Sequence, residues 1–124
     1  MVNRAVELGQ PAIALTDHGN LHGAIDIYQS AKSAGIKPII GVEGYVANGP
    51  RDEKNPQKRF PFHMTLLAQN RVGYQNLMKL VTASHLEGFY YRPRMDREIL
   101  EKYSEGLIVL SGCPSGELAR DIKN

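Results

Sequence analysis

The stretch AIALTDHGN (residues 12–20) decides the fold class, because a short apolar run ends there directly in polar residues. Residues 12–15 are small and apolar, and an acid and an imidazole, Asp17 and His18, follow almost at once. In folds that alternate strands and helices, functional side chains gather where strands end, since the loops converge there. The stretch therefore predicts a buried strand that carries Asp17 and His18 to a functional site.

Further apolar runs and helical patterns extend this arrangement along the chain. Three more strands are predicted by the runs KPIIGVEGYVA (37–47), HMTLLA (63–68) and GLIVLSG (106–112). None of these runs alternates cleanly with polar residues, which is typical of strands buried on both faces of a parallel sheet. Helical spacing of apolar residues, such as Leu21, Ala24, Ile25, Tyr28, Ala31 and Ala34, predicts helices over 20–35, 71–88, 95–106 and 115–122. This order predicts an α/β fold with mostly parallel strands and right-handed crossovers.

The length and the two ends of the sequence bear on domain organisation. The 124 residues are enough for one domain. The segment 48–62 is polar, contains three prolines and fits no regular element, so we expect a mobile loop there. The sequence begins in a helical pattern and stops within another, and four strands cannot close a barrel. We therefore expect residues 1–124 to form part of a larger domain.

Composition excludes few classes of function. The chain is 42% hydrophobic and 23% charged, with a net charge of +2 that neither requires nor excludes a nucleic-acid partner. No apolar run approaches the roughly 20 residues that span a bilayer. The first ten residues lack the apolar core of a signal peptide, and one cysteine cannot form an internal disulfide. We therefore expect a cytoplasmic protein with no membrane partner.

Four residues near the predicted strands form a candidate metal-ligand set. His18 and Cys113 follow strands, Glu43 lies near the end of one, and His63 opens one. Zinc accepts nitrogen, sulfur and oxygen ligands together, whereas manganese and iron prefer nitrogen and oxygen. Asp17 fits better as a helix cap or as an acceptor that orients an imidazole than as a direct ligand.

Each of these residues also has a structural interpretation. His18 could bond a backbone carbonyl, His63 could be half-buried without a ligand role, and Cys113 could fill a core position. Glu43 lies among apolar neighbours, where a buried carboxylate needs a partner of some kind. His22 and His85 lie on predicted helices, and we interpret both as surface or packing residues.

Two basic segments are candidates for contact with nucleic acid or a partner. In the segment 48–62, four cations are interspersed with Asp52 and Glu53, which favours a solvated loop. The segment GFYYRPR (88–94) combines aromatic residues with Arg92 and Arg94, a mixture that contacts phosphates and bases in single-strand binding proteins. The alternative is that these aromatics pack internally and the arginines form structural pairs.

The order and spacing of several motifs resemble a known family. The motifs are ALTDHGN (14–20), GIKPIIGVE (35–43), LMKLV (77–81), GFYY.PR (88–94) and LSGC.SGE (110–117). Together they resemble the PHP (polymerase and histidinol phosphatase) domain of the alpha subunits of bacterial DNA polymerase III. The similarity extends over nearly the whole chain. Stand-alone PHP phosphatases are not expected to share GYQNLMKLV (73–81) or GFYYRPR (88–94).

The resemblance implies a distorted (β/α)7 barrel with up to three zinc, manganese or iron ions at the strand ends. The positions that match the metal ligands of the family are His18, Glu43, His63 and Cys113, and Asp17 matches a neighbouring position. A His-x-His motif of the family is expected before residue 1, and an Asp-x-His motif after residue 124. The resemblance thus implies that this chain carries only part of a metal site.

The resemblance also implies a function, with two alternatives. The parent protein would be a DNA-directed DNA polymerase that acts in DNA replication with DNA and with other replicase subunits, such as a proofreading exonuclease or a sliding clamp. Its PHP domain would either hydrolyse phosphoesters in a metal-dependent 3′–5′ exonuclease reaction or serve as a scaffold. The alternatives are a stand-alone phosphatase, such as histidinol phosphatase, and a docking module with a vestigial metal site. The chain alone is expected to be inactive.

Overall fold

A computed structural model of the chain describes residues 1–123. The elements, in chain order, are α1 (Val2–Glu7), β1 (Ala12–His18), α2 (Ala24–Ser33), β2 (Lys37–Val46), the 3₁₀ turn η1 (Pro56–Lys58), β3 (Phe62–Ala68), α3 (Arg71–Leu86), β4 (Arg94–Met95), α4 (Arg97–Lys102), β5 (Leu107–Leu110) and α5 (Glu117–Lys123). The four predicted strands and four predicted helices are confirmed as an α/β arrangement. The short strand β4 was not predicted.

The strands form one sheet of mixed direction. The order is β1-β2-β3-β5, and β4 pairs with β2 beyond the point where β1 ends. β1 and β4 run parallel to β2, whereas β3 is antiparallel to both β2 and β5. The prediction of mostly parallel strands is therefore wrong for β3. The segment between β2 and β3 contains only η1, whereas a parallel pair is usually connected through an α-helix.

Two edge strands also correct the expected burial on both faces. β1 is partly exposed along its length, and Ile108, Val109 and Leu110 of β5 are exposed. Within residues 1–123 the sheet is open, with β1 and β5 at its edges. The complete barrel implied by the resemblance therefore stays a prediction.

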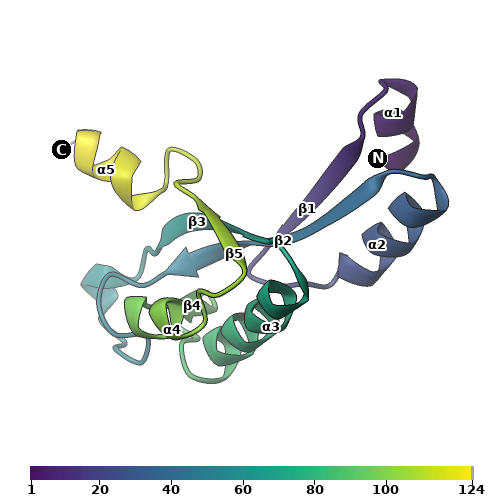
Figure 1. Ribbon diagram of the computed structural model, residues 1–124. Helices are drawn as coiled ribbons and strands as arrows, with labels where there is room; N and C mark the ends of the chain where they lie inside the picture. The colour runs from purple at the N-terminus through teal and green to yellow at the C-terminus, as the bar shows by residue number, and fades with distance from the viewer. Residues whose placement is uncertain (124) are drawn as a thin grey trace.

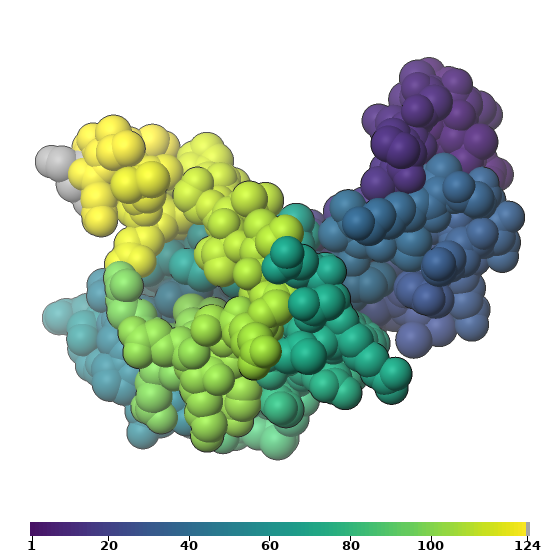
Figure 2. All heavy atoms as spheres, in the orientation of Figure 1, coloured from purple at the N-terminus to yellow at the C-terminus, as the bar shows by residue number. Residues whose placement is uncertain are grey.

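The molecule consists of an arm and a body. The arm comprises α1, β1, α2 and the N-terminal half of β2, and it extends away from the body, which contains α3, α4, β3, β4 and β5 (Figure 1). The space-filling view shows the arm standing apart from the body, with α5 projecting on the opposite side (Figure 2). The long strand β2 runs through both parts and so connects them.

The hydrophobic core lies in the body. Helices α3 and α4 pack against β2, β3 and β4 through six buried residues, Val42, Leu66, Leu77, Leu80, Met95 and Ile99. Asn70 and Asp96 cap the N-termini of α3 and α4 by accepting hydrogen bonds from backbone N–H groups. In the arm, the buried residues of α2 are two alanines, Ala24 and Ala31, and one larger apolar residue, Ile27. None of the helices within residues 1–123 combines the length and apolar character that a membrane-spanning helix needs.

Candidate metal centre

The pairing of three strands places two imidazoles and a carboxylate on one face of the sheet. His18 at the end of β1 is opposite Glu43 of β2. Tyr45 lies two residues further along β2 and is opposite His63 of β3. Because side chains of a strand alternate between faces, Glu43 and Tyr45 share a face, and their paired histidines join them there. The strand register thus assembles a site from residues 25 and 45 positions apart from His18.

The carboxylate of Glu43 lies between the two imidazoles. Its Oε2 is 3.2 Å from Nε2 of His18, and its Oε1 is 2.8 Å from Nδ1 of His63. The side chains of Glu43 and His63 are 20% and 24% exposed, whereas that of His18 is 61% exposed. One ligand atom from each of the three residues lies within 4.8 Å of the others. This is a compact set of two nitrogen donors and one anionic oxygen donor.

Cys113 joins this set from the loop after β5. Its Sγ is 3.5 Å from Nδ1 of His63 and 4.0 Å from Oε1 of Glu43. The loop is held beside β3 by a hydrogen bond from the N–H of His63 to the carbonyl of Ser115. The Ser115 N–H also donates to Sγ of Cys113 at 3.4 Å. The backbone therefore fixes the position of the sulfur next to the imidazole.

The spacing of these donors fits a shared divalent cation. In a tetrahedral zinc site, bond lengths of about 2.0–2.3 Å place two donor atoms about 3.3–3.6 Å apart. The His63–Cys113 distance of 3.5 Å lies within this range and the His18–Glu43 distance of 3.2 Å just below it, whereas the His63–Glu43 distance of 2.8 Å is that of a direct hydrogen bond and would lengthen if both residues bound one cation. Nitrogen, oxygen and sulfur together are a ligand set that zinc accepts. All four predicted ligands are thus brought together.

Asp17 lies elsewhere. Its Oδ2 accepts a hydrogen bond from the N–H of Gly23, at the start of α2, with a distance of 3.0 Å. Adjacent residues of a strand point to opposite faces, so Asp17 and His18 diverge. This contact fits the interpretation that Asp17 anchors the segment before a helix, and a ligand role of Asp17 stays a prediction.

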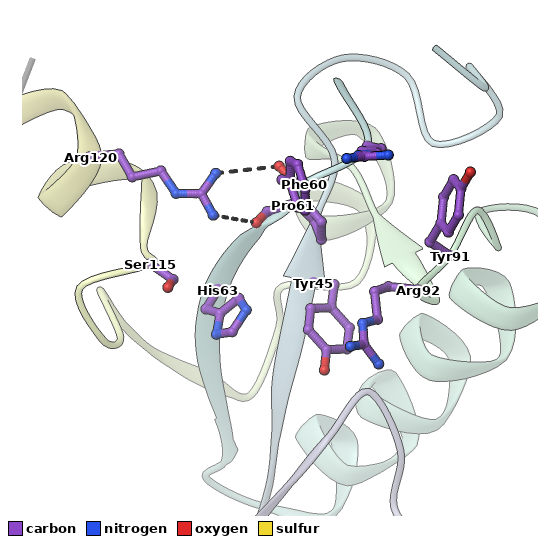
Figure 3. A pocket seen from close by; sticks show the side chains of 9 residues that line it. Tyr45, Phe60, Pro61, His63, Tyr91, Arg92, Ser115 and Arg120 are labelled. Atoms are coloured by element: carbon purple, nitrogen blue, oxygen red, sulfur yellow. Dashed lines mark hydrogen bonds between the residues drawn. The ribbon is translucent and has the colours of Figure 1, made fainter. Parts of the chain in front are cut away.

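An open pocket of about 620 Å³ adjoins the site, and His63 lines both (Figure 3). Three cations, Arg59, Arg92 and Arg120, line this pocket together with the aromatic residues Tyr45, Phe60 and Tyr91. The guanidinium of Arg92 lies 5.7 Å from the centroid of the Tyr45 ring, and that of Arg59 lies 4.7 Å from the centroid of Phe60. Among residues 1–123, none of the three arginines forms a salt bridge with a carboxylate. The guanidinium of Arg120 donates hydrogen bonds to the carbonyl oxygens of Phe60 and Pro61, so the positive charge most open to an anion is that of Arg59 and Arg92.

The loop that carries Arg59 and Phe60 is held by two other arginines. Arg94 is 1% exposed, and its guanidinium donates to the carbonyl oxygens of Gly88, Arg51 and Glu53. Burial lowers the pKa of Arg94 below its ordinary value. Arg51 pairs with Glu87 at 2.6 Å and with Asp96 at 3.1 Å.

Burial of Arg94 corrects one prediction. A side chain that is enclosed and bonded to three carbonyls is not available to nucleic acid or a partner, so the structural interpretation holds for Arg94. Arg92 is exposed at the pocket, and its contact with such a partner stays a prediction.

Sequence reasoning missed three pocket residues. Tyr45 could have been found, because it lies two residues after Glu43 and hence on the same face of the strand. Its ring packs edge-on to that of His63, with centroids 5.2 Å apart. Arg59 was noted only as one cation of a segment interpreted as a solvated loop, and Arg120 had no signal, because the fold alone brings the segment 48–62 and α5 to one pocket.

Comparison with known proteins gives a consistent result over the whole chain. A family model described as PHP domain matches residues 1–123. The chain is 52% identical over 122 residues to a DNA polymerase III subunit alpha of Borreliella burgdorferi, covering 97% of this chain and 11% of that protein. Identity is 50% over 120 residues to the corresponding protein of Chlamydia pneumoniae, covering 95% and 10% of the two chains. For Thermus aquaticus it is 50% over 115 residues, covering 90% and 9%. The chain thus spans about a tenth of the length of these curated relatives.

Proposed function

The chain belongs to the PHP domain family, and we propose that it is a metal-binding PHP domain within the alpha subunit of a bacterial replicative DNA polymerase. This proposal is supported by the sequence identity of 50–52% to proteins named DNA polymerase III subunit alpha. The parent protein would polymerise DNA during replication and contact DNA and other replicase subunits. The names of the relatives favour this function over that of a stand-alone phosphatase.

One observation carries the metal-binding role. The carboxylate of Glu43 lies between two imidazoles, and a thiol lies 3.5 Å from one of them. His18, Glu43, His63 and Cys113 would hold a divalent cation. When bound, such a cation supplies Lewis acidity toward a phosphoryl oxygen and lowers the pKa of a bound water.

The adjoining pocket supports phosphate esters as the substrate class. The guanidinium groups of Arg59 and Arg92 line the pocket, where they could donate charge-assisted hydrogen bonds to the phosphate of a bound nucleic-acid strand. Tyr45 and Phe60 supply aromatic faces for a base. His63 belongs both to the pocket lining and to the donor set, so the pocket and the proposed cation site adjoin each other. These residues fit 3′–5′ hydrolysis of a nucleic acid better than a purely structural role.

We propose that the complete site needs ligands from outside the 124 residues, as the resemblance implies. The resemblance implies up to three ions, and four donors are too few to hold more than one of them; without the neighbouring ligands, these four side chains are also less well held in place. The chain alone should therefore bind zinc or manganese weakly and should not hydrolyse DNA at a measurable rate.

Calorimetric titration of the 124-residue chain with zinc or manganese tests the metal site. Glu43→Gln keeps the shape of the side chain but removes its charge, and it should weaken binding at least tenfold. Glu101→Gln on the exposed surface of α4 is the matched control and should bind like the unaltered chain. Equal binding by the two variants would refute the assignment.

A second assay tests the expected inactivity of the chain. The chain is incubated with a 3′-labelled single-stranded oligonucleotide and manganese, and release of the terminal nucleotide should stay at background. Hydrolysis that disappears in His18→Ala would show that the four donors suffice, and would overturn the requirement for further ligands.

A further inference from the structure

The residue that follows His18 is held on both sides by hydrogen bonds. Gly19 has a φ of +68°, which glycine adopts readily. Its N–H donates to the carbonyl of Glu43 at 2.9 Å. Its carbonyl accepts a hydrogen bond from Nε2 of His85, in the last turn of α3, at 2.8 Å. Because a carbonyl can only accept, the imidazole of His85 carries its proton on Nε2.

The space around this turn is filled as well. A Cβ atom on Gly19 would lie 2.8 Å from Cγ of Pro93 and 3.0 Å from Cε2 of Tyr45. Tyr45 in turn packs near both metal-site imidazoles, with ring centroids 6.4 Å from that of His18 and 5.2 Å from that of His63. A shift of the Gly19 turn would therefore move His18 relative to the other donors.

His18 depends on such support more than the other donors do. Among His18, Glu43 and His63, its side chain is the most exposed. It ends an edge strand of the arm, and within residues 1–123 β1 pairs only with β2. The His85 hydrogen bond joins α3 of the body to the end of β1 across 66 residues of sequence. Figure 1 shows that β1 otherwise extends away from the body.

We propose that His85 is a positioning residue for the metal site. Through the carbonyl of Gly19, it fixes the end of β1 so that the imidazole of His18 stays beside Glu43. His85 touches none of the proposed donors itself. This inference rests on the proposed metal-binding function, and it goes beyond the sequence interpretation of His85 as a surface or packing residue.

The test compares two substitutions of His85 in the 124-residue chain. His85→Gln keeps an N–H donor that can reach the Gly19 carbonyl, whereas His85→Leu removes it. Residues that support metal ligands typically change affinity 10- to 100-fold. His85→Leu should therefore weaken cobalt or zinc binding about tenfold, and His85→Gln should stay within about threefold of the unaltered chain. His22→Leu makes the same chemical change at an exposed position before α2 and is the matched control.

Two further readouts separate positioning from loss of folding or loss of the proposed function. Because His85 is itself exposed and loses a single hydrogen bond, His85→Leu should stay folded, with a melting temperature only slightly below that of His22→Leu. Without metal, nuclear Overhauser contacts between the rings of His18 and Tyr45 should weaken in His85→Leu and persist in His85→Gln.

The outcomes are distinct. Metal affinity of His85→Leu within threefold of the unaltered chain would overturn the positioning role. If the unaltered chain bound no metal, the proposed function would fail, and the ring contacts measured without metal would decide the inference by themselves. Ring contacts retained in His85→Leu would then refute it, and their selective loss would support it.

Discussion

Replacement of Asp96 by alanine should destabilise the chain more than replacement of any exposed acid. Asp96 is 5% exposed and caps α4, with its Oδ1 accepting a hydrogen bond from the N–H of Ile99 at 3.1 Å. Its Oδ2 accepts from the backbone N–H of Arg51 at 2.9 Å and from the guanidinium of Arg51 at 3.1 Å. Burial raises the pKa of Asp96, but these hydrogen bonds outweigh it, so the pKa lies below its ordinary value. The residue therefore functions as an anion that joins the segment after β2 to α4.

The magnitude follows from the contacts that alanine would remove. Loss of an N-cap costs about 1 kcal/mol. Loss of the charged acceptor leaves the Arg51 N–H without its partner and costs about 1.5–3 kcal/mol. The guanidinium of Arg51 keeps its pairing with Glu87, which limits the further loss. Asp96→Ala should thus lower the free energy of unfolding by about 3 kcal/mol.

Urea unfolding followed by circular dichroism measures this difference. The matched control is Glu98→Ala, because Glu98 is an acid in the first turn of α4, next to the cap, and lies 3.6 Å from the same guanidinium. The side chain of Glu98 is 78% exposed, so its removal should cost less than about 1 kcal/mol. Equal losses for the two variants, or a loss below about 1 kcal/mol for Asp96→Ala, would refute the reasoning.

Three further predictions concern pH, backbone conformation and the thiol. Because the folded-state pKa of Asp96 is lowered, the stability that its carboxylate contributes is present above its unfolded pKa of about 3.9 and is lost as the pH falls through the folded pKa. Asp96→Asn should therefore make the free energy of unfolding depend less on pH below a pH of about 4. Gly19→Ala should lower the melting temperature more than Gly35→Ala, because both have positive φ but only the first would bring a Cβ within 2.8 Å of Pro93. Equal shifts would contradict this. Alkylation of Cys113 by iodoacetamide, measured by mass spectrometry, should slow when zinc is added, and an unchanged rate would argue against the sulfur as a ligand.

The sequence predicts which segments are strands but not where they end or how they pair. The polar residues Asp17 and His18 suggest that the first strand stops near Leu15, whereas β1 continues through His18. It continues because each of its residues pairs with one of β2, up to the pair of His18 with Glu43. The direction of β3 cannot be predicted either, since a short, mostly apolar run such as residues 63–68 gives the same pattern for a parallel and an antiparallel strand.

Helix α2 shows why the burial of side chains is harder to predict from sequence than secondary structure. Its apolar residues recur at helical spacing, yet Ile25 and Tyr28 are 60% and 49% exposed, whereas Ile27 is buried. Helical spacing defines which residues share a face, but the side on which β2 lies decides which face is covered.

Some residues of the candidate site could be identified from sequence, and others only from the tertiary structure. The resemblance identified His18, Glu43, His63 and Cys113, and the structure brings them together. Strand alternation separates Asp17 from them, a distinction that position in the sequence does not reveal. The three pocket arginines come from segments more than 25 residues apart, so only tertiary structure could identify them as a group.

The placement of the donors links metal binding to the relation between arm and body. His18 ends a strand of the arm, whereas His63 lies on β3 in the body and Cys113 follows β5. Glu43 lies on β2, the strand that both parts share. A cation held by His18 and His63 together would therefore connect the arm to the body. Apart from β2, the described residues join the two parts at this point through contacts such as the His85–Gly19 hydrogen bond. A ligand that binds only the folded state stabilises it by RT ln(1 + [L]/Kd). Metal should therefore stabilise the contact between arm and body. This stabilisation should be smaller when His85 no longer holds the end of β1, because the metal affinity is then lower.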